Sequence, residues 1–377
     1  MLTMLGSALL MAGCGGGGGG TTTAGAVAGS SASGAITGFG SIIVGGVRFD
    51  DSAASVRDDN DVVMNSGDLK LGMVVRIKCG KKTDDGRSIR AKADSIEVHS
   101  ELQGPVDSKT ATSIVVLGQT VKISATTFFD DGLTAAALKK GDVVEVHGFV
   151  DPVAKTFTAT RIELKPNAQV FKLQGEISAL NTTAKTFKIG TITINYGTAV
   201  VPSSLTLKEG SVVRVRLVTT PVNGIWTARK VQKFEMEMED RNEAEVEGII
   251  TAFTSTALFS VNGLPVNASG IVVPAGVKLG ARVEVEGSIV NGVLVAKKVE
   301  LEDDADVAKF ELHGTISLLN PTAKTLVLRG MTVNYNNAVF GIGVTAVSLA
   351  DPLLNFEVKG VRSEGNVIVA TRISLER

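Results

Sequence analysis

Apolar and polar residues alternate along most of the chain, in short runs separated by glycine, asparagine, aspartate and proline. Residues 143–150, VVEVHGFV, and residues 155–164, KTFTATRIEL, show this alternation on either side of an Asp-Pro turn. A period of two residues predicts strands with one face toward a core and one face outward. Valine, isoleucine and glycine are abundant and helical periods are scarce, so the pattern predicts an all-β protein.

The same pattern recurs five times, with a period of about 70 residues. Each copy opens with a strand that pivots on a glycine, namely Gly34, Gly104, Gly175, Gly248 and Gly314. A second signature follows in four copies as LKLGMVVRI, LKKGDVVEV, LKEGSVVRV and VKLGARVEV, whereas the fifth copy keeps the strand and loses the glycine. A fixed period is typical of a tandem array. We therefore expect modules at residues 34–101, 102–168, 169–240, 241–309 and 310–377.

The second copy predicts the topology of one module. Its alternation and turn residues predict strands at 102–107, 113–117, 121–124, 143–150 and 155–164, and its Ala-rich segment predicts a short helix at 133–139. Three strands, a short helix and two further strands follow the order of the OB-fold, a small Greek-key barrel. Each module is thus expected to be an OB-like five-stranded β-barrel with one short helix.

The first residues resemble a targeting signal. Residues 1–13 form an apolar run that ends in Met-Ala-Gly before Cys14, and this arrangement resembles the lipobox of bacterial lipoproteins. The resemblance implies a signal peptide at 1–13, cleavage before Cys14 and lipidation of its thiol. Residues 14–33 are almost entirely Gly, Ser, Thr and Ala, which predicts a flexible tether. A lipid-anchored protein of the cell envelope is expected, and Gly15 favours the outer membrane by the lipoprotein sorting rule.

A second resemblance lies in the first module. Residues 34–50, GAITGFGSIIVGGVRFD, resemble the opening motif of a bacterial lipoprotein family of repeated domains of unknown function. The resemblance implies a location in the cell envelope and a fold of small β-barrels. It implies no activity.

Charge and aromatic content limit the partners. The chain has 38 Lys and Arg residues against 39 Asp and Glu residues, so it has no basic footprint for a polyanion. Aromatic residues are only 5% of the chain, too few for the stacking platforms that bind single strands. Nucleic acid is therefore not an expected partner. Once Cys14 is lipidated only Cys79 remains, and its inward position predicts a small buried hydrophobe.

Strand alternation also shows which charged residues of the fourth strand face outward. They are Arg76 and Lys78, Glu145 and His147, Arg214 and Arg216, Glu284 and Glu286, and Glu357 and Lys359. Copies one and three are basic on this face, and copies two and four are acidic. We expect solvated faces, with docking of neighbouring modules through alternating charge as the alternative.

Candidate chemistry is sparse. His99, His147 and His313 occupy non-equivalent positions, so we expect solvated histidines at strand edges, no metal site and no cofactor. The segment from Asp58 through Asp59 to Asp61 has residue types that suit calcium but not the EF-hand spacing. The glycines around Phe39, Gly40 and Ser41 predict a bulge or tight turn at a barrel corner, with a binding loop as the alternative.

These observations lead to two hypotheses on function. The first is a non-enzymatic, membrane-anchored envelope lipoprotein that acts as a modular spacer or protein-interaction scaffold, held to the membrane by Cys14 and bound to another envelope protein. The alternative is a glycan- or cation-binding lipoprotein that uses barrel loops. Its candidate ligand-binding residues are Phe39, Gly40, Ser41, Asp58, Asp59 and Asp61.

Overall fold

The computed structural model describes residues 29–86, 88–130, 132–234, 236–362 and 368–376. The predicted signal peptide, Cys14 and most of the tether lie outside these residues. The last four tether residues, 30–33, belong to strand β1 (Ser30–Ala35), so the first barrel begins earlier than the predicted Gly34. Among the described residues, no helix has the length and apolar character needed to cross a bilayer.

The described chain is all-β, and its strands close into small five-stranded barrels, numbered here in chain order. The second barrel consists of β10 (Leu102–Lys109), β11 (Ser113–Val116), β12 (Gln119–Lys122), β14 (Val143–Asp151) and β15 (Thr156–Leu164). Strand β10 pairs with β11, β11 with β12, β12 with β15 in parallel, β15 with β14, and β14 again with β10. This circuit is OB-like, as predicted.

The third, fourth and fifth barrels repeat the circuit. The third contains β16 (Phe171–Asn181), β17 (Thr186–Ile189), β18 (Ile192–Asn195), β19 (Val212–Leu217) and β20 (Ile225–Lys233). The fourth contains β21 (Arg241–Ser255), β22 (Leu258–Val261), β23 (Leu264–Asn267), β24 (Arg282–Val290) and β25 (Val293–Leu301). The fifth contains β26 (Lys309–Asn320), β27 (Thr325–Leu328), β28 (Met331–Asn334), β30 (Asn355–Arg362) and β31 (Ile368–Leu375).

The first barrel differs because its opening strand is broken. It consists of β1, β2 (Gly38–Phe39), β3 (Ile42–Val44), β4 (Val47–Asp50), β7 (Val74–Cys79) and β9 (Ile89–His99). Short accessory strands complete the described part of the molecule: β5 (Ser55–Asp58), β6 (Val63–Met64), β8 (Thr83–Asp84), β13 (Phe128–Phe129) and β29 (Val339–Phe340). Strands β5, β13 and β29 each run parallel to the last strand of their barrel.

The predicted helix at 133–139 is wrong, because this segment forms turns. Side chains satisfy its backbone locally: Thr134 Oγ1 accepts the Ala137 N–H at 3.2 Å, and Asp142 accepts the Lys139 N–H at 2.8 Å. A seven-residue segment gains too few helical hydrogen bonds to offset nucleation. The described helices are single turns, η1 (Ser66–Asp68), η2 (Ser348–Ala350) and α1 (Asp304–Val307), the last between the fourth and fifth barrels.

The barrels are not five separate domains. Strand β1 pairs in parallel with β21, β2 pairs in parallel with β26, and β10 meets β16 at Gln103 and Lys172. The described strands therefore form two continuous sheets. The apolar interior forms three clusters: one for the first and fifth barrels, one for the second and third, and one for the fourth.

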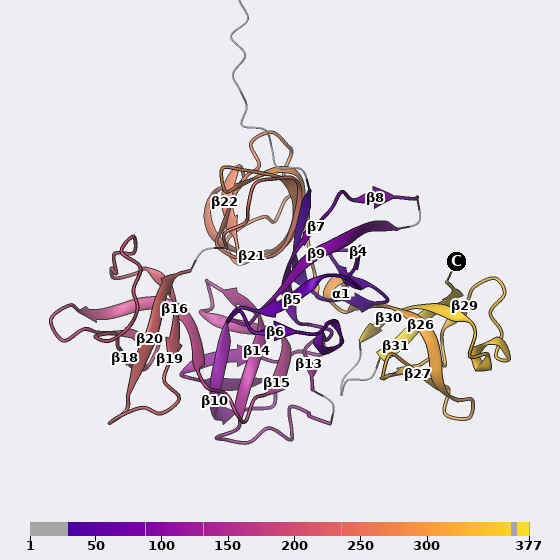
Figure 1. Ribbon diagram of the computed structural model, residues 1–377, viewed down its shortest axis with the longest axis horizontal. Coiled ribbons are helices and arrows are strands. Elements are labelled where there is room, and N and C mark those ends of the chain that lie inside the picture. The colour runs from indigo at the N-terminus through magenta and orange to yellow at the C-terminus, as the bar shows by residue number, and fades with distance from the viewer. Residues whose placement is uncertain (1–28, 87, 131, 235, 363–367, 377) are drawn as a thin grey trace, which may run out of the picture.

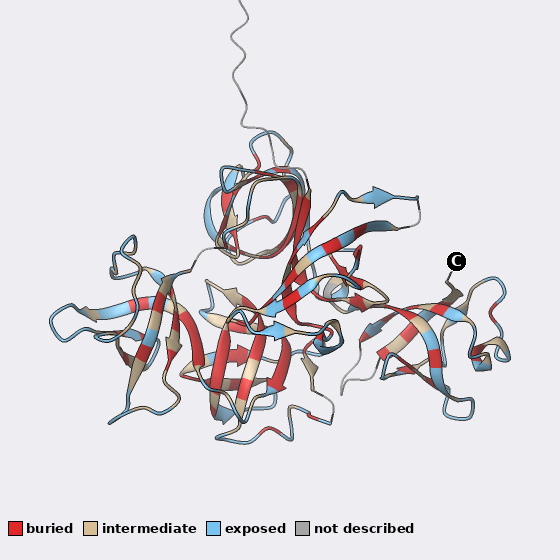
Figure 2. Ribbon diagram, viewed as in Figure 1, coloured by how far each residue is buried: buried red, intermediate tan, exposed pale blue. Residues whose placement is uncertain are grey.

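Figure 1 shows the indigo first barrel in the middle of the molecule, with the other barrels around it. Figure 2 shows buried residues on the strands of the barrels and exposed residues on the outer hairpins. Strand alternation is as predicted: Val75, Ile77 and Cys79 of β7 are buried. Burial raises the pKa of the Cys79 thiol to about 11, so this thiol is protonated at neutral pH.

Candidate functional site at the barrel junction

The outward faces of many barrel strands are covered by neighbouring barrels. His99, His147 and His313 are only 5%, 1% and 2% exposed, so the expectation of solvated histidines is wrong. Lys172 and Arg161 are also buried. Part of the faces that alternation predicted to be outward is therefore covered by neighbouring barrels, whereas Lys78 and Lys359 are exposed.

The loop that contains Asp58, Asp59 and Asp61 takes part in one of these contacts. Asp59 is buried and its Oδ1 lies 2.6 Å from Lys172 Nζ of the third barrel. Arg216 of the third barrel donates a hydrogen bond to the Asp59 carbonyl. Asp58 accepts the backbone N–H groups of Asn60 and Val62, each at 2.8 Å, which fixes the loop. Asp59 thus binds a lysine of this chain, whereas Asp61 lies exposed at the turn.

The loop that contains Phe39, Gly40 and Ser41 lies against the fifth barrel. A Cβ on Gly38 would approach the Glu311 carbonyl oxygen to 2.2 Å, and a Cβ on Gly40 would approach the His313 Cβ to 2.2 Å. Gly40 also has a φ of 133°, which side chains rarely adopt. The two glycines permit β2 to pair with β26. This explains why the GFGS segment occurs in the first copy alone.

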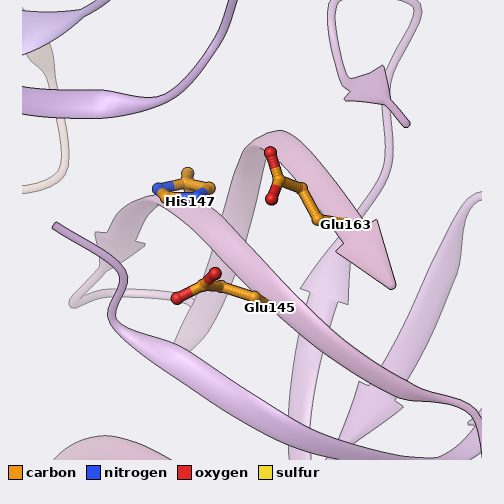
Figure 3. Close-up of side chains that lie close together, drawn as sticks. All are labelled: Glu145, His147 and Glu163. Carbon is orange, nitrogen blue, oxygen red and sulfur yellow. The ribbon is translucent and has the colours of Figure 1, made fainter. Parts of the chain in front are cut away.

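The structure gathers a group of ionisable side chains that the sequence did not identify as a site. Glu145 and His147 alternate on β14, and Glu163 pairs with Glu145 from β15. One ligand atom from each of the three side chains lies within 4.8 Å of the others (Figure 3). Glu163 and His147 are buried, and Glu145 is half-buried.

Cations surround the two carboxylates of this cluster. Lys165 Nζ lies 3.1 Å from Glu145 Oε2 and 2.7 Å from Glu163 Oε2, so it bridges them. Lys172 Nζ lies 3.2 Å from Glu145 Oε1, and it donates to Ser100 Oγ at 2.7 Å. Arg161 pairs with Glu163. The cluster is continuous with the contact between Lys172 and Asp59, and it links the first three barrels.

The environment shifts the pKa values in opposite directions. Burial alone would raise the pKa of Glu145, but Lys172, Lys165 and the hydrogen bond from Ser100 hold it well below its ordinary value. Burial lowers the pKa of His147, with Glu145 opposing, so the imidazole is neutral at pH 7. The pKa of Lys165 is raised, because its two glutamates outweigh its partial burial. The junction is therefore an ionic network of carboxylates and cations around a neutral histidine.

Two other barrels carry a related arrangement. The fifth barrel groups Glu311, His313 and Glu357, and Lys359 lies 3.1 Å from Glu311 and 2.9 Å from Glu357. The fourth barrel groups Glu284, Glu286 and Glu300, and Lys298 lies 3.0 Å from both Glu286 and Glu300. A lysine that bridges two glutamates on the outer barrel face thus occurs in the second, fourth and fifth barrels of the described chain.

Comparisons with known proteins agree with the repeated organisation. Residues 103–163 and 247–300, in the second and fourth barrels, match a family model described as a domain of unknown function (DUF5666). No curated protein matches the chain. A solved structure described as "drosophila Unr CSD456" is 16% identical, and the alignment covers 55% of this chain and 99% of that chain with a TM-score of 0.13. A TM-score of this size carries no argument on function.

Proposed function

We propose that the protein is a non-enzymatic, membrane-anchored lipoprotein of the cell envelope that acts as a rigid protein-interaction scaffold. The observation that supports rigidity most directly is the buried ionic network that joins the first three barrels through Lys172, Asp59 and Glu145. Buried ion pairs of this kind require a fixed geometry, because separating them leaves charges without partners. A scaffold of five fixed repeats presents its exposed loops at constant spacing.

The anchor in this proposal rests on the sequence. The lipobox resemblance at Cys14 and the Gly-rich residues that follow it support a lipid anchor with a spacer. Strand β1, which begins at Ser30 shortly after this spacer, pairs with both β7 and β21. An anchor at Cys14 would therefore be attached to the central first barrel rather than to a peripheral barrel.

A surface suited to a protein partner lies on the fifth barrel. In the segment between β29 and β30, Ile342, Val347 and Leu353 are 88%, 83% and 87% exposed. Large apolar side chains this exposed gain free energy when a partner covers them. We propose that this segment contacts the envelope protein partner.

Crosslinking in cells, followed by mass spectrometry of the recovered complexes, tests the scaffold. The wild-type chain is expected to yield one recurrent envelope protein, and a triple variant with Ile342→Ser, Val347→Ser and Leu353→Ser is expected to lose it. Val272→Ser is the matched control, because Val272 is 97% exposed on the fourth barrel, away from this segment. Recovery of the wild-type chain without a partner would overturn the scaffold proposal, and retention of the partner by the triple variant would overturn this surface.

Lipidation is tested separately. A radiolabelled fatty acid is expected to label the wild-type protein, and Cys14→Ser is expected to abolish the label and release the protein from the membrane fraction. Labelling that persists in Cys14→Ser would overturn the anchor.

The alternative function, ligand capture by the two candidate loops, has less support. Asp59 already pairs with Lys172, and Gly40 lies against His313. A cation remains a candidate ligand at a different place, the cluster of Glu145, His147 and Glu163.

A further inference from the structure

One nitrogen of His147 is a buried acceptor without a donor. His147 Nδ1 lies 2.7 Å from the carbonyl oxygen of His99. A carbonyl oxygen can only accept a hydrogen bond, so Nδ1 carries the hydrogen and Nε2 of the neutral ring presents a lone pair. Nε2 is buried, and it has no hydrogen-bond partner among the described residues. One ring nitrogen of His147 lies within 4.8 Å of carboxylate oxygens of Glu145 and Glu163, which are also acceptors.

Three acceptors that converge at the barrel junction, one of them without a donor, suit a cation that all three can bind. We propose that Glu145, His147 and Glu163 form a binding site for a divalent transition metal, with zinc the best match to one imidazole nitrogen and two carboxylate oxygens. Zinc binds these atoms at about 2.0–2.2 Å and accepts such mixed nitrogen and oxygen sets. This inference goes beyond the proposed scaffold function and does not depend on it.

The surroundings of His147 match those of a metal-binding histidine. Such histidines donate their second ring N–H to a carboxylate or a backbone carbonyl, which fixes the ring and its tautomer. The contact from His147 Nδ1 to the His99 carbonyl has this form. The ligand atoms lie within 4.8 Å of one another, so small side-chain rotations bring them to the separations that a shared metal needs.

In the described structure Lys165 makes two of the three contacts that the metal would make, because it reaches the carboxylates but not His147 Nε2. Its ammonium bridges the carboxylates of Glu145 and Glu163, and its side chain is 38% exposed. The lysine can therefore move into solvent when a metal enters. Two further cations, Lys172 and Arg161, stay beside the cluster and contact Asp59 and Asp130 on their other sides.

The two carboxylates of the cluster suit a divalent ion. Lys165 supplies one positive charge that Glu145 and Glu163 share, beside Lys172 on Glu145 and Arg161 on Glu163. A divalent metal in place of Lys165 would give the two carboxylates one further positive charge.

The related cluster of the fifth barrel provides a control. His313 Nε2 lies 2.6 Å from Glu311, and its Nδ1, which has no hydrogen-bond partner among the described residues, lies 3.3 Å from Glu376. A metal bound to Nε2 there would displace the existing contact with Glu311. We therefore expect the metal at His147 and not at His313.

Calorimetric titration of the untagged full chain with Zn²⁺ alone tests the proposal. One equivalent is expected to bind to the wild-type chain and to raise its Tm, whereas Mg²⁺ is not. His147→Gln is expected to weaken binding at least about 100-fold, because it removes a ligand of the metal. His313→Gln is expected to leave the affinity unchanged.

Lys165→Met keeps the proposal testable even if His147→Gln fails to fold. This change removes the competing ammonium, so Zn²⁺ is expected to bind roughly 10-fold more tightly than to the wild-type chain, a gain of about 1.4 kcal/mol. Co²⁺ in the same variant is expected to show the visible absorption of a four- or five-coordinate site. Absence of saturable Zn²⁺ binding, binding that survives His147→Gln in a folded protein, or weaker binding in Lys165→Met would each overturn the proposal.

Discussion

At the scale of single residues, the described chain is unusual for the charged groups that it buries between its barrels. Lys172 is the clearest case: its side chain is 3% exposed, and it contacts Asp59 from the first barrel and Glu145 from the second. An isolated buried charge is strongly unfavourable, but paired and hydrogen-bonded charges are tolerated and specify geometry. The fit between the barrels therefore depends on the completeness of these pairs.

Removing the Lys172 ammonium is expected to destabilise the fold strongly. In Lys172→Met, the carboxylates of Asp59 and Glu145 lose a buried partner, and the free energy of unfolding is expected to fall by about 3–5 kcal/mol. Lys155→Met is the matched control, because Lys155 pairs with Glu176 at 2.9 Å while both side chains are exposed. The control is expected to change stability by about 1 kcal/mol or less in urea unfolding. Equal effects of the two changes would contradict the assigned role of Lys172.

The raised pKa of Glu284 leads to a prediction about how stability depends on pH. Burial, with repulsion from Glu245 and Glu302, raises its pKa from 4.5 to about 8. Between these two values the folded protein keeps a proton that the unfolded chain releases, so stability falls as the pH rises. Glu284→Gln is expected to have a higher Tm than the wild-type chain at pH 8, with the difference shrinking toward pH 4.5. If the Tm of Glu284→Gln falls with rising pH as much as the Tm of the wild-type chain does, the Glu284 carboxylate is not the cause.

At the scale of elements, the strands of each barrel follow the local pattern closely. Strand β10 begins at Leu102 and β14 at Val143, the residues predicted from alternation. The alternation of apolar and polar residues along a strand decides which side chains enter the core, and this pattern can be read from neighbouring residues alone. The expected helix is absent because the Thr134 and Asp142 side chains accept backbone N–H groups of this Ala-rich segment in a turn.

The candidate site was only partly predictable, for a physical reason. Alternation placed Glu145 and His147 outward, but it could not show what covers that face. Lys172 and Asp59 come from segments far apart in the sequence, and their contact exists only once three barrels are docked. The sequence indicated contact between barrels only through the opposite outward charges of successive copies. Solvation was the wrong expectation for His147, which is buried.

The broken opening strand of the first barrel leads to a prediction about docking. Gly38→Ala places a Cβ against the Glu311 carbonyl oxygen, so β2 must separate from β26. Stability is expected to fall by about 1–3 kcal/mol in thermal or urea unfolding, as for other overpacked sites. Gly67→Ala is the control, because a Cβ there meets no atom within 4 Å. A Gly38→Ala variant as stable as Gly67→Ala would contradict the proposed docking role.

At the scale of the whole molecule, the described barrels form one body rather than a string of separate units. Shared strand pairs join the first barrel to the fourth and fifth, and the ionic network joins it to the second and third. Cation–π contacts add further links, with Arg282 4.9 Å from the Phe149 ring and Arg362 4.0 Å from the Phe128 ring. Fixed spacing of the exposed loops follows from this arrangement, and the proposed scaffold needs such spacing.

The distance between the third and fifth barrels tests this account most directly. Spin labels at Thr183→Cys and Thr322→Cys, in the exposed turns of equivalent hairpins, report that distance by double electron–electron resonance in a Cys14→Ser background, where Cys79 remains buried. A rigid body predicts one narrow distance distribution, which broadens in Lys172→Met. A broad distribution in the protein with Lys172 intact would show that the barrels move independently, and would contradict the account.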